Sequence, residues 1–173
     1  MRLIKVLSKI MLAAGFIVYL YLLIKLILFK WGPVNIESLF YQLRRTLQHP
    51  DMIFKRQGNY IPFREISRGI ENMSIYEPFS QMNLTGNIIA FIPFGIFIPM
   101  IFSKKGASFI AVFILSLLLS LCFEVTQLVL YIGTFDVDDL ILNTFGGMVG
   151  YVFFRVFIGS DKRRRKKRKI AKT

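Results

Sequence analysis

Four long apolar stretches divide the chain, and each is long enough to cross a lipid bilayer as a helix. They cover residues 10–29, 84–102, 108–131 and 140–158. Each has roughly the 17–25 residues that a helix needs to cross about 30 Å of hydrocarbon. None shows the alternation with a period of two that membrane barrels have. The pattern therefore predicts an all-α membrane protein with four transmembrane helices and an outer loop of about 50 residues between the first two.

The first stretch is expected to stay in the protein as a span rather than to be cleaved as a signal peptide. Its apolar part is too long for a signal peptide, and no A-x-A-like cleavage site precedes the polar residues that begin at Asn35. The second stretch contains Pro93 and Pro99, which could break it into a re-entrant hairpin. We expect instead a helix kinked at Pro93, because a hairpin would leave an odd number of crossings and place both ends of the chain on opposite sides.

The outer loop, residues 30–83, contains its own helical pattern. Apolar residues recur at helical spacing and are Ile36, Leu39, Phe40, Leu43 and Leu47. The stripe fits a helix that lies on the membrane surface and fits equally a helix that packs on its own loop. The sequence leaves these two interpretations open.

Composition and the rare residue types narrow the class further. Apolar residues make up 54 % of the chain, above the roughly 45–50 % of soluble domains. The chain has one Cys and one His, which exclude a disulfide framework, a Cys-based zinc site and a multi-His metal site. We therefore expect neither a metal nor a cofactor.

The net charge of +13 is concentrated near the C-terminus. An unbroken basic run is formed by Lys162, Arg163, Arg164, Arg165, Lys166, Lys167, Arg168 and Lys169. It follows closely on the fourth apolar stretch, and basic clusters beside a membrane span bind anionic lipids. We therefore predict that this tail binds the membrane surface and not nucleic acid.

Positive charges also predict the orientation of the spans. Basic residues lie in the segment 1–9, at Lys104 and Lys105 between the second and third spans, and in the tail 159–173. The short segment 132–139 has no Lys or Arg and three Asp. Since cytoplasmic loops carry an excess of Lys and Arg, we expect both termini in the cytoplasm of a bacterial cell, and the long loop and the acidic loop outside.

Polar residues inside the spans fall at a common depth. At about 1.5 Å per residue, Asn87, Glu124 and Asn143 lie about 7–9 Å outward of the midpoints of their spans, and so does Lys25. Lys25 can extend towards the surface beside Lys30. The candidate polar site consists of Asn87, Glu124, Gln127, Asp136, Asp139 and Asn143. We expect Glu124 to be its central charge, oriented by the amides, because ionisable groups inside a membrane usually face the bundle and have partners.

This cluster could serve as an outward-facing site or as a polar latch that only holds the bundle together. Interhelical hydrogen bonds contribute only about 0.6 kcal/mol on average, so a latch would be a modest stabiliser. A membrane enzyme that acts on a lipid-linked phosphate through Mg²⁺ or Ca²⁺, and a small transporter, are alternatives. The sequence shows no nucleophile–base pair, no phosphate-binding Gly loop and no inverted repeat, which argues against both.

Glycines in the fourth span predict close helix packing. Gly146 and Gly150 form a G-x-x-x-G pattern, and Gly147 adds further bare backbone. Small residues let two helices approach each other closely in a membrane. The pattern suits a contact inside one chain and equally a homo-oligomer.

Several motifs, taken together, resemble the VanZ-like family of bacterial membrane proteins, named after a teicoplanin-resistance protein. The matching segments are Asn59-Tyr-Ile-Pro-Phe63, Asn83-Leu-Thr-Gly-Asn87 with Phe91-Ile-Pro-Phe-Gly95, Phe123-Glu-Val-Thr-Gln127, Asp136-Val-Asp-Asp139 and Asn143-Thr-Phe-Gly-Gly147. They cover about residues 59–151. Many members carry an Arg shortly before the first Asp of the series, where this chain has Gly133-Thr134-Phe135. The resemblance implies a multi-pass protein of the bacterial plasma membrane, linked to the cell envelope and to glycopeptide resistance, with a cell-envelope ligand as a possible partner.

Reporter fusions test the predicted topology. Fusions of a periplasm-active and a cytoplasm-active reporter after Lys105, Gly133 and Thr173 should read cytoplasmic, outside and cytoplasmic, because the basic segments stay inside. A fusion after Thr173 that reads outside would overturn the four-span arrangement.

Overall fold

The structure, a computed structural model, describes residues 2–30, 32–71, 78–102 and 107–159 of the 173-residue chain. Its long helices are α1 (Arg2–Phe29), α4 (Pro78–Ile101), α5 (Phe109–Leu130) and α6 (Val137–Phe153), and α6 continues into the π-helical turn η2 (Phe154–Gly159). Within the described residues, four helices are long and apolar enough to cross a membrane. The predicted all-α fold with four spans is therefore confirmed.

Three helices begin earlier than predicted, and α1 begins at Arg2, within the segment 1–9 that was predicted to precede the first span. α4 begins at Pro78, ahead of the predicted span at residue 84, although its membrane-compatible part is Leu84–Ile101. α6 begins at Val137 rather than at residue 140, because the Asp136 side chain accepts a hydrogen bond from the backbone N–H of Asp138 and caps the helix. Two of the three Asp residues assigned to the acidic loop are therefore in the first turn of α6.

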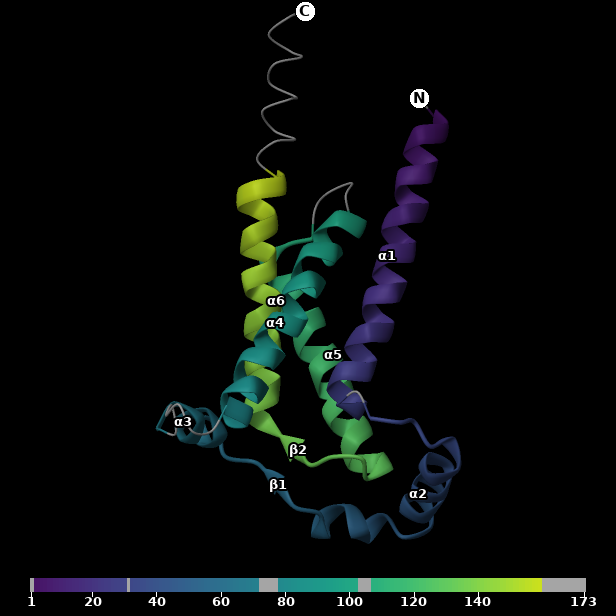
Figure 1. The fold of residues 1–173 in the computed structure, drawn as a ribbon, viewed down its shortest axis with the longest axis vertical. Helices are drawn as coiled ribbons and strands as arrows, with labels where there is room; N and C mark the ends of the chain where they lie inside the picture. Colours follow the sequence, from purple (N-terminus) through teal and green to yellow (C-terminus); the bar gives the residue numbers. More distant parts are fainter. Residues whose placement is uncertain (1, 31, 72–77, 103–106, 160–173) are drawn as a thin grey trace, which may run out of the picture.

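Much of the segment predicted as an outer loop is folded. It contains α2 (Ile36–Gln48), the 3₁₀ helix η1 (Pro50–Lys55), the short strand β1 (Gly58–Asn59) and α3 (Arg64–Glu71). β1 pairs in parallel with β2 (Phe135–Asp136), which immediately precedes α6. Figure 1 shows these elements at one end of the helix bundle, opposite the end where α1 begins. We call this the loop end of the bundle.

α2 packs one edge of its apolar stripe on α5, and contact of the other edge with the membrane surface stays a prediction. Leu39 and Leu43 are half-buried and Thr46 is buried, and the Thr46 hydroxyl donates to the carbonyl oxygen of Val129 in α5 over 2.9 Å. The neighbouring face carries Ile36 and Phe40, which are more than half exposed. One edge of the apolar stripe thus packs on the protein, and the other is exposed at the loop end.

Arg56 joins this outer segment to the end of α5. Its guanidinium donates to the carbonyl oxygens of Leu128 and Val129 and to the Thr46 hydroxyl, and it lies 4.7 Å from the centre of the Tyr131 ring. The last carbonyls of a helix have no partner within the helix, so a cation placed there satisfies them and interacts favourably with the helix dipole.

Glycines bring the backbones of α4 and α6 into direct contact. A Cβ atom added at Gly146 would meet the carbonyl oxygen of Ile88, and one added at Gly150 would meet that of Ile92, both well inside van der Waals distance. Gly95 of α4 faces the Gly147 carbonyl in the same way. The G-x-x-x-G pattern therefore makes a contact inside one chain. Whether the protein also forms a homo-oligomer stays a prediction.

α4 remains one helix through both of its prolines. Since proline has no N–H, the helix lacks a hydrogen bond near Pro93, and neighbouring groups can compensate for such a break. The carbonyl oxygen left without its helical donor by Pro93 is that of Ile89, whereas the Tyr19 hydroxyl of α1 donates to the next one, Ala90, over 2.8 Å. The re-entrant alternative does not occur, and the kink at Pro93 stays a prediction.

Alanine at Gly150 should disrupt the α4–α6 contact. Because the added methyl group would collide with backbone, which cannot move aside, we expect Gly150→Ala to lower stability by about 1–3 kcal/mol, the range for overpacked cores. Thermal unfolding of the detergent-purified protein measures this. Gly15→Ala is the matched control, because its Cβ would meet only the Phe97 ring, at 3.9 Å. Equal melting temperatures for the two variants would contradict the proposed packing.

Candidate functional site

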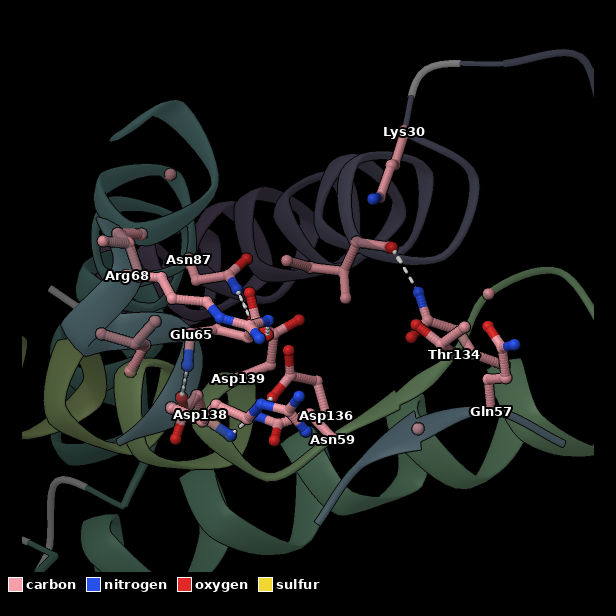
Figure 2. Close-up of a pocket in the computed structure, with 18 of the residues that line it drawn as sticks. Lys30, Gln57, Asn59, Glu65, Arg68, Asn87, Thr134, Asp136, Asp138 and Asp139 are labelled. Atoms are coloured by element: carbon pink, nitrogen blue, oxygen red, sulfur yellow. Dashed lines mark hydrogen bonds and ion pairs between the residues drawn. The ribbon is translucent and has the colours of Figure 1, made fainter. Parts of the chain in front are cut away.

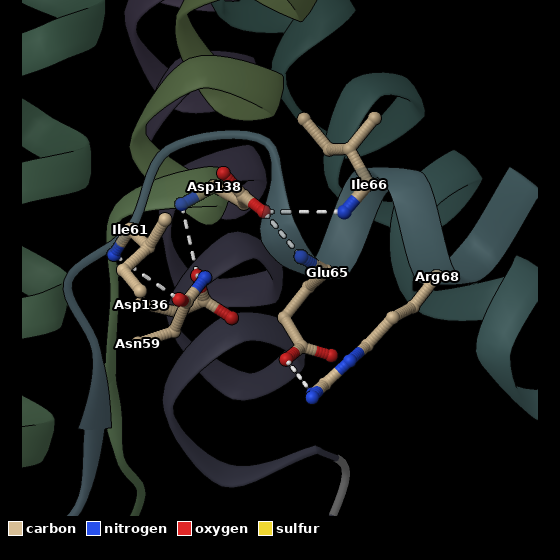
Figure 3. Close-up of polar contacts among 7 residues, drawn as sticks. All are labelled: Asn59, Ile61, Glu65, Ile66, Arg68, Asp136 and Asp138. Atoms are coloured by element: carbon tan, nitrogen blue, oxygen red, sulfur yellow. Dashed lines mark hydrogen bonds and ion pairs between the residues drawn. The ribbon is translucent and has the colours of Figure 1, made fainter.

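The paired strands hold the outer segment against the start of α6. In the parallel register, Gly58 lies opposite Phe135 and Asn59 opposite Asp136. The Asn59 side-chain amide donates to the Asp136 carboxylate over 2.8 Å, and its oxygen accepts from the backbone N–H of Ile61 over 3.2 Å (Figure 3). Asn59 thereby fixes both the strand pair and the turn that follows it.

Asp138 connects α6 to the first turn of α3. Its carboxylate is 1 % exposed and accepts three backbone N–H groups, from Phe63 at 2.5 Å, Glu65 at 2.7 Å and Ile66 at 3.1 Å. Two of these bonds are drawn in Figure 3. Phe63 has a φ of 67°, a conformation uncommon for a residue with a side chain. Asp138 therefore caps a helix that is distant in the sequence, and the prediction that it lies in a loop is wrong.

Glu124 is buried behind this junction. It is 0 % exposed, and its Oε2 accepts the backbone N–H of Asp136 over 2.7 Å. Its other oxygen, Oε1, has no hydrogen-bond partner among the described residues. Burial raises the pKa of the neighbouring Asp136 carboxyl, against the lowering effect of the bonds from Asn59 and the Asp138 backbone. The backbone of Asp136 rather than an amide side chain therefore holds Glu124, and its role as the central charge of a site stays a prediction.

The amides of the candidate site make other contacts than those expected. Asn87 donates to Asp139 over 2.5 Å, and Asn143 donates to the Ser120 hydroxyl over 2.9 Å. Gln127 donates to the Ile27 carbonyl oxygen in the last turn of α1, over 2.9 Å. The three amides therefore connect α4, α5, α6 and α1 to one another rather than orienting Glu124.

A polar row extends from Glu124 into the bundle between α5 and α6. On α5 it follows the helical spacing of Ser116, Ser120 and Glu124, all 0 % exposed. Within the described part of the chain, the buried polar atoms along this interface that lack a partner belong to Ser116, Glu124, Asn143 and Thr144. Buried polar groups without partners are rare in proteins and are often found where a protein functions. The row shows that the polar character of the site continues below its surface.

A cavity of about 650 Å³ opens in front of these residues, at the loop end of the bundle (Figure 2). Four of the six predicted site residues line it: Asn87, Gln127, Asp136 and Asp139. Glu124 and Asn143 are not in its wall. The sequence analysis missed the contribution of the outer segment, which consists of Lys30, Gln57, Gly58, Asn59, Arg64, Glu65 and Arg68. The motif around Asn59 was a signal, but nothing in the sequence placed it over the helix ends.

Lys25 takes no part in the cavity wall. Its amine donates to the Gly32 carbonyl oxygen over 3.3 Å and lies 5.9 Å from the centre of the Phe29 ring. The side chain therefore extends towards the end of α1, as expected. The basic run Lys162–Lys169 and the loop residues Lys104 and Lys105 lie outside the described residues, so their membrane contacts stay predictions.

The arrangement is suited to binding through hydrogen bonds and ion pairs. No group of three His, Cys, Asp or Glu residues within the described ranges is placed to hold a metal ion. The Asp carboxylates instead accept protein N–H groups, while the wall also contains the basic side chains of Lys30, Arg64 and Arg68. A ligand with both acidic and basic groups could therefore pair with the wall.

Removing the Asp138 carboxylate should release α3. Asp138→Ala leaves three backbone N–H groups without their acceptor, so we expect a loss of about 2–3 kcal/mol in stability. Thermal unfolding in detergent measures the loss, and faster trypsin cleavage after Arg64 or Arg68 reports the local opening. Asp51→Ala, at an exposed ion pair with Lys55, should change neither. An unchanged tryptic pattern for Asp138→Ala would show that the cap is unimportant.

Comparisons with known proteins identify the family of the chain. The sequence profile of the VanZ/LLP1 family matches residues 16–158, a wider region than the residues 59–151 that carry the motifs. Protein VanZ of Enterococcus faecium is 36 % identical over 146 residues, which cover 84 % of this chain and 72 % of that protein. No solved structure matches the chain. Because the family profile matches most of the chain, the chain belongs to the VanZ/LLP1 family.

Proposed function

We propose that this VanZ-family membrane protein uses the cavity at the loop end as an outward-facing site for a cell-envelope ligand. Through that site it would limit the access of a glycopeptide of the teicoplanin type to its target. The observation that carries the proposal is the position of four predicted polar residues in the wall of one cavity of about 650 Å³. Ligand sites are usually such concave, largely preformed pockets with a few convergent polar groups.

The burial of Glu124 supports a functional role over a purely structural one. A carboxylate with no exposed surface and one unpartnered oxygen is an unfavourable way to stabilise a helix bundle, because desolvating a charge is expensive. Among the described residues, its carboxylate accepts a hydrogen bond from the backbone N–H of Asp136, whose side chain lines the cavity. Glu124 is therefore placed to support the cavity wall from behind.

Orientation connects the site with the cell exterior in this proposal. The cavity lies at the end of the bundle opposite the start of α1 (Figure 1). With both termini in the cytoplasm, as the positive charges predict, this end faces outward. A cell-envelope ligand would then reach the cavity without crossing the membrane.

Conservative changes at the two key carboxyls test the proposal. In a teicoplanin-susceptible host that expresses the protein, Glu124→Gln and Asp139→Asn should return the minimal inhibitory concentration of teicoplanin to that of cells without the protein. Each variant keeps the size of its side chain and removes only the carboxylate. Membrane level, measured by immunoblot, should remain unchanged.

Two exposed acids provide matched controls. Glu37→Gln and Asp51→Asn make the same chemical changes at exposed positions on α2 and η1, and they should leave susceptibility unchanged. If both site variants insert normally and keep the wild-type phenotype, the site has no such function. If they lower the melting temperature and the membrane level together with the phenotype, the polar cluster is a structural latch.

A further inference from the structure

The cavity straddles the boundary between the spans and the segments outside them. Its wall contains Leu26 and Leu84 from within membrane-compatible helices, and Lys30, Arg64 and Thr134 from outside them. In a bilayer, such a boundary lies between the hydrocarbon core and the head-group region. The cavity is therefore at the depth where lipid head groups lie.

Basic side chains line the cavity wall at the end of α1 and on α3. Lys30 follows the last turn of α1, and Arg64 and Arg68 belong to α3. Arg68 pairs with Glu65 over 2.7 Å. The side chains of Lys30 and Arg64 make no hydrogen bond or ion pair with any described residue. Exposed cations at a helix end and on a neighbouring helix, near the level of lipid phosphates, are suited to bind a phosphate group.

Another part of the wall carries acids with free capacity. Asp136 uses Oδ1 to accept from Asn59 and from the Asp138 backbone, and Asp139 uses Oδ1 to accept from Asn87. Among the described residues, no hydrogen bond reaches the Oδ2 atom of either carboxylate. Asp138 differs, because both of its oxygens are taken up by α3. Two carboxylate oxygens therefore remain for a donor that is not part of the protein.

The balance of charges selects between ligand classes. A ligand with only an anionic group would satisfy Lys30 and Arg64 but would be repelled by Asp136 and Asp139. A ligand with only a cationic group would pair with Asp136 and Asp139 but would be repelled by Lys30 and Arg64. A ligand that carries a phosphate and an amine together can pair with both parts of the wall. The apolar wall residues Leu26, Ile27, Leu84 and Leu142 suit an attached acyl glycerol.

We propose that the cavity binds the head group of an amine-bearing phospholipid, with the phosphate at Lys30 and Arg64 and the primary amine at Asp136 and Asp139. This inference rests on the proposed function, since it names the chemical class of the cell-envelope ligand. The head group of such a phospholipid supplies both the negative phosphate and the positive amine that the wall residues can bind.

Native mass spectrometry of the detergent-purified full chain tests the assignment. Phosphatidylethanolamine and phosphatidylglycerol with identical acyl chains are titrated separately, and the fraction of protein with one bound lipid gives the two affinities. We expect phosphatidylethanolamine to bind about tenfold more tightly, because only its amine forms charge-assisted hydrogen bonds with the acidic wall. Equal affinities for the two lipids would overturn the proposal.

Variants assign the two ends of the head group. Asp139→Asn should reduce the preference for phosphatidylethanolamine to about twofold or less, and Asp136→Asn should weaken it in the same direction. The double variant Lys30→Gln/Arg64→Gln should weaken both lipids, since both carry the phosphate. Lys9→Gln/Arg44→Gln, at exposed positions outside the cavity wall, is the matched control. Unaltered lipid preference in Asp139→Asn and Asp136→Asn would refute the acidic site.

Two further arms separate the sources of the ligand and the two proposals. Glycerophosphoethanolamine without acyl chains should compete only weakly, whereas strong competition would show that a soluble phosphate ester, and not a lipid, is the ligand. If the variants lose the teicoplanin phenotype but wild type shows no lipid preference, the proposed function stands and the lipid assignment fails. If lipid binding follows the prediction and the variants keep the teicoplanin phenotype, the lipid assignment stands and the proposed function fails.

Discussion

The site depends on one constraint, which is that polar groups at the end of a membrane bundle must find partners within the protein. Asp138 meets this constraint most fully, because its buried carboxylate accepts three N–H groups from the first turn of α3 and the residue before it. Together with the pairing of β1 and β2, it folds the segment between α1 and α4 back over the start of α6. Without this attachment, the basic residues of α3 and the acids of α6 would not share a cavity.

Close helix packing below the cavity has a different physical origin. The backbones of α4 and α6 touch at Gly146 and Gly150, since no hydrophobic effect drives helices together within lipid and small residues allow close van der Waals contact. Around this contact the bundle buries an aromatic core in which Phe91, Phe94 and Phe123 pack against α1. The rigid pair α4–α6 sets the position of Asn87 relative to Asp139, whose hydrogen bond forms one side of the cavity.

The polar row between α5 and α6 differs from the apolar core beside it. It contains several fully buried polar atoms without partners in the described chain, directly below a cavity whose wall is held by satisfied hydrogen bonds. In a bundle built only for stability, apolar residues at these positions would cost less. That the cluster around Glu124 has a function stays a proposal.

The sequence by itself determined the four helices and their approximate ends, because apolar length is a local property. It also predicted a common depth for Asn87, Glu124, Asn143 and Lys25 from the rise of a helix. It also indicated the close packing at Gly146 and Gly150. It did not determine that Asn59 would pair with Asp136, or that Asp138 would cap α3. Those pairings lie more than seventy residues apart along the chain. Only the tertiary structure decides them, since backbone N–H groups and carboxylates can pair in many ways and the fold selects one.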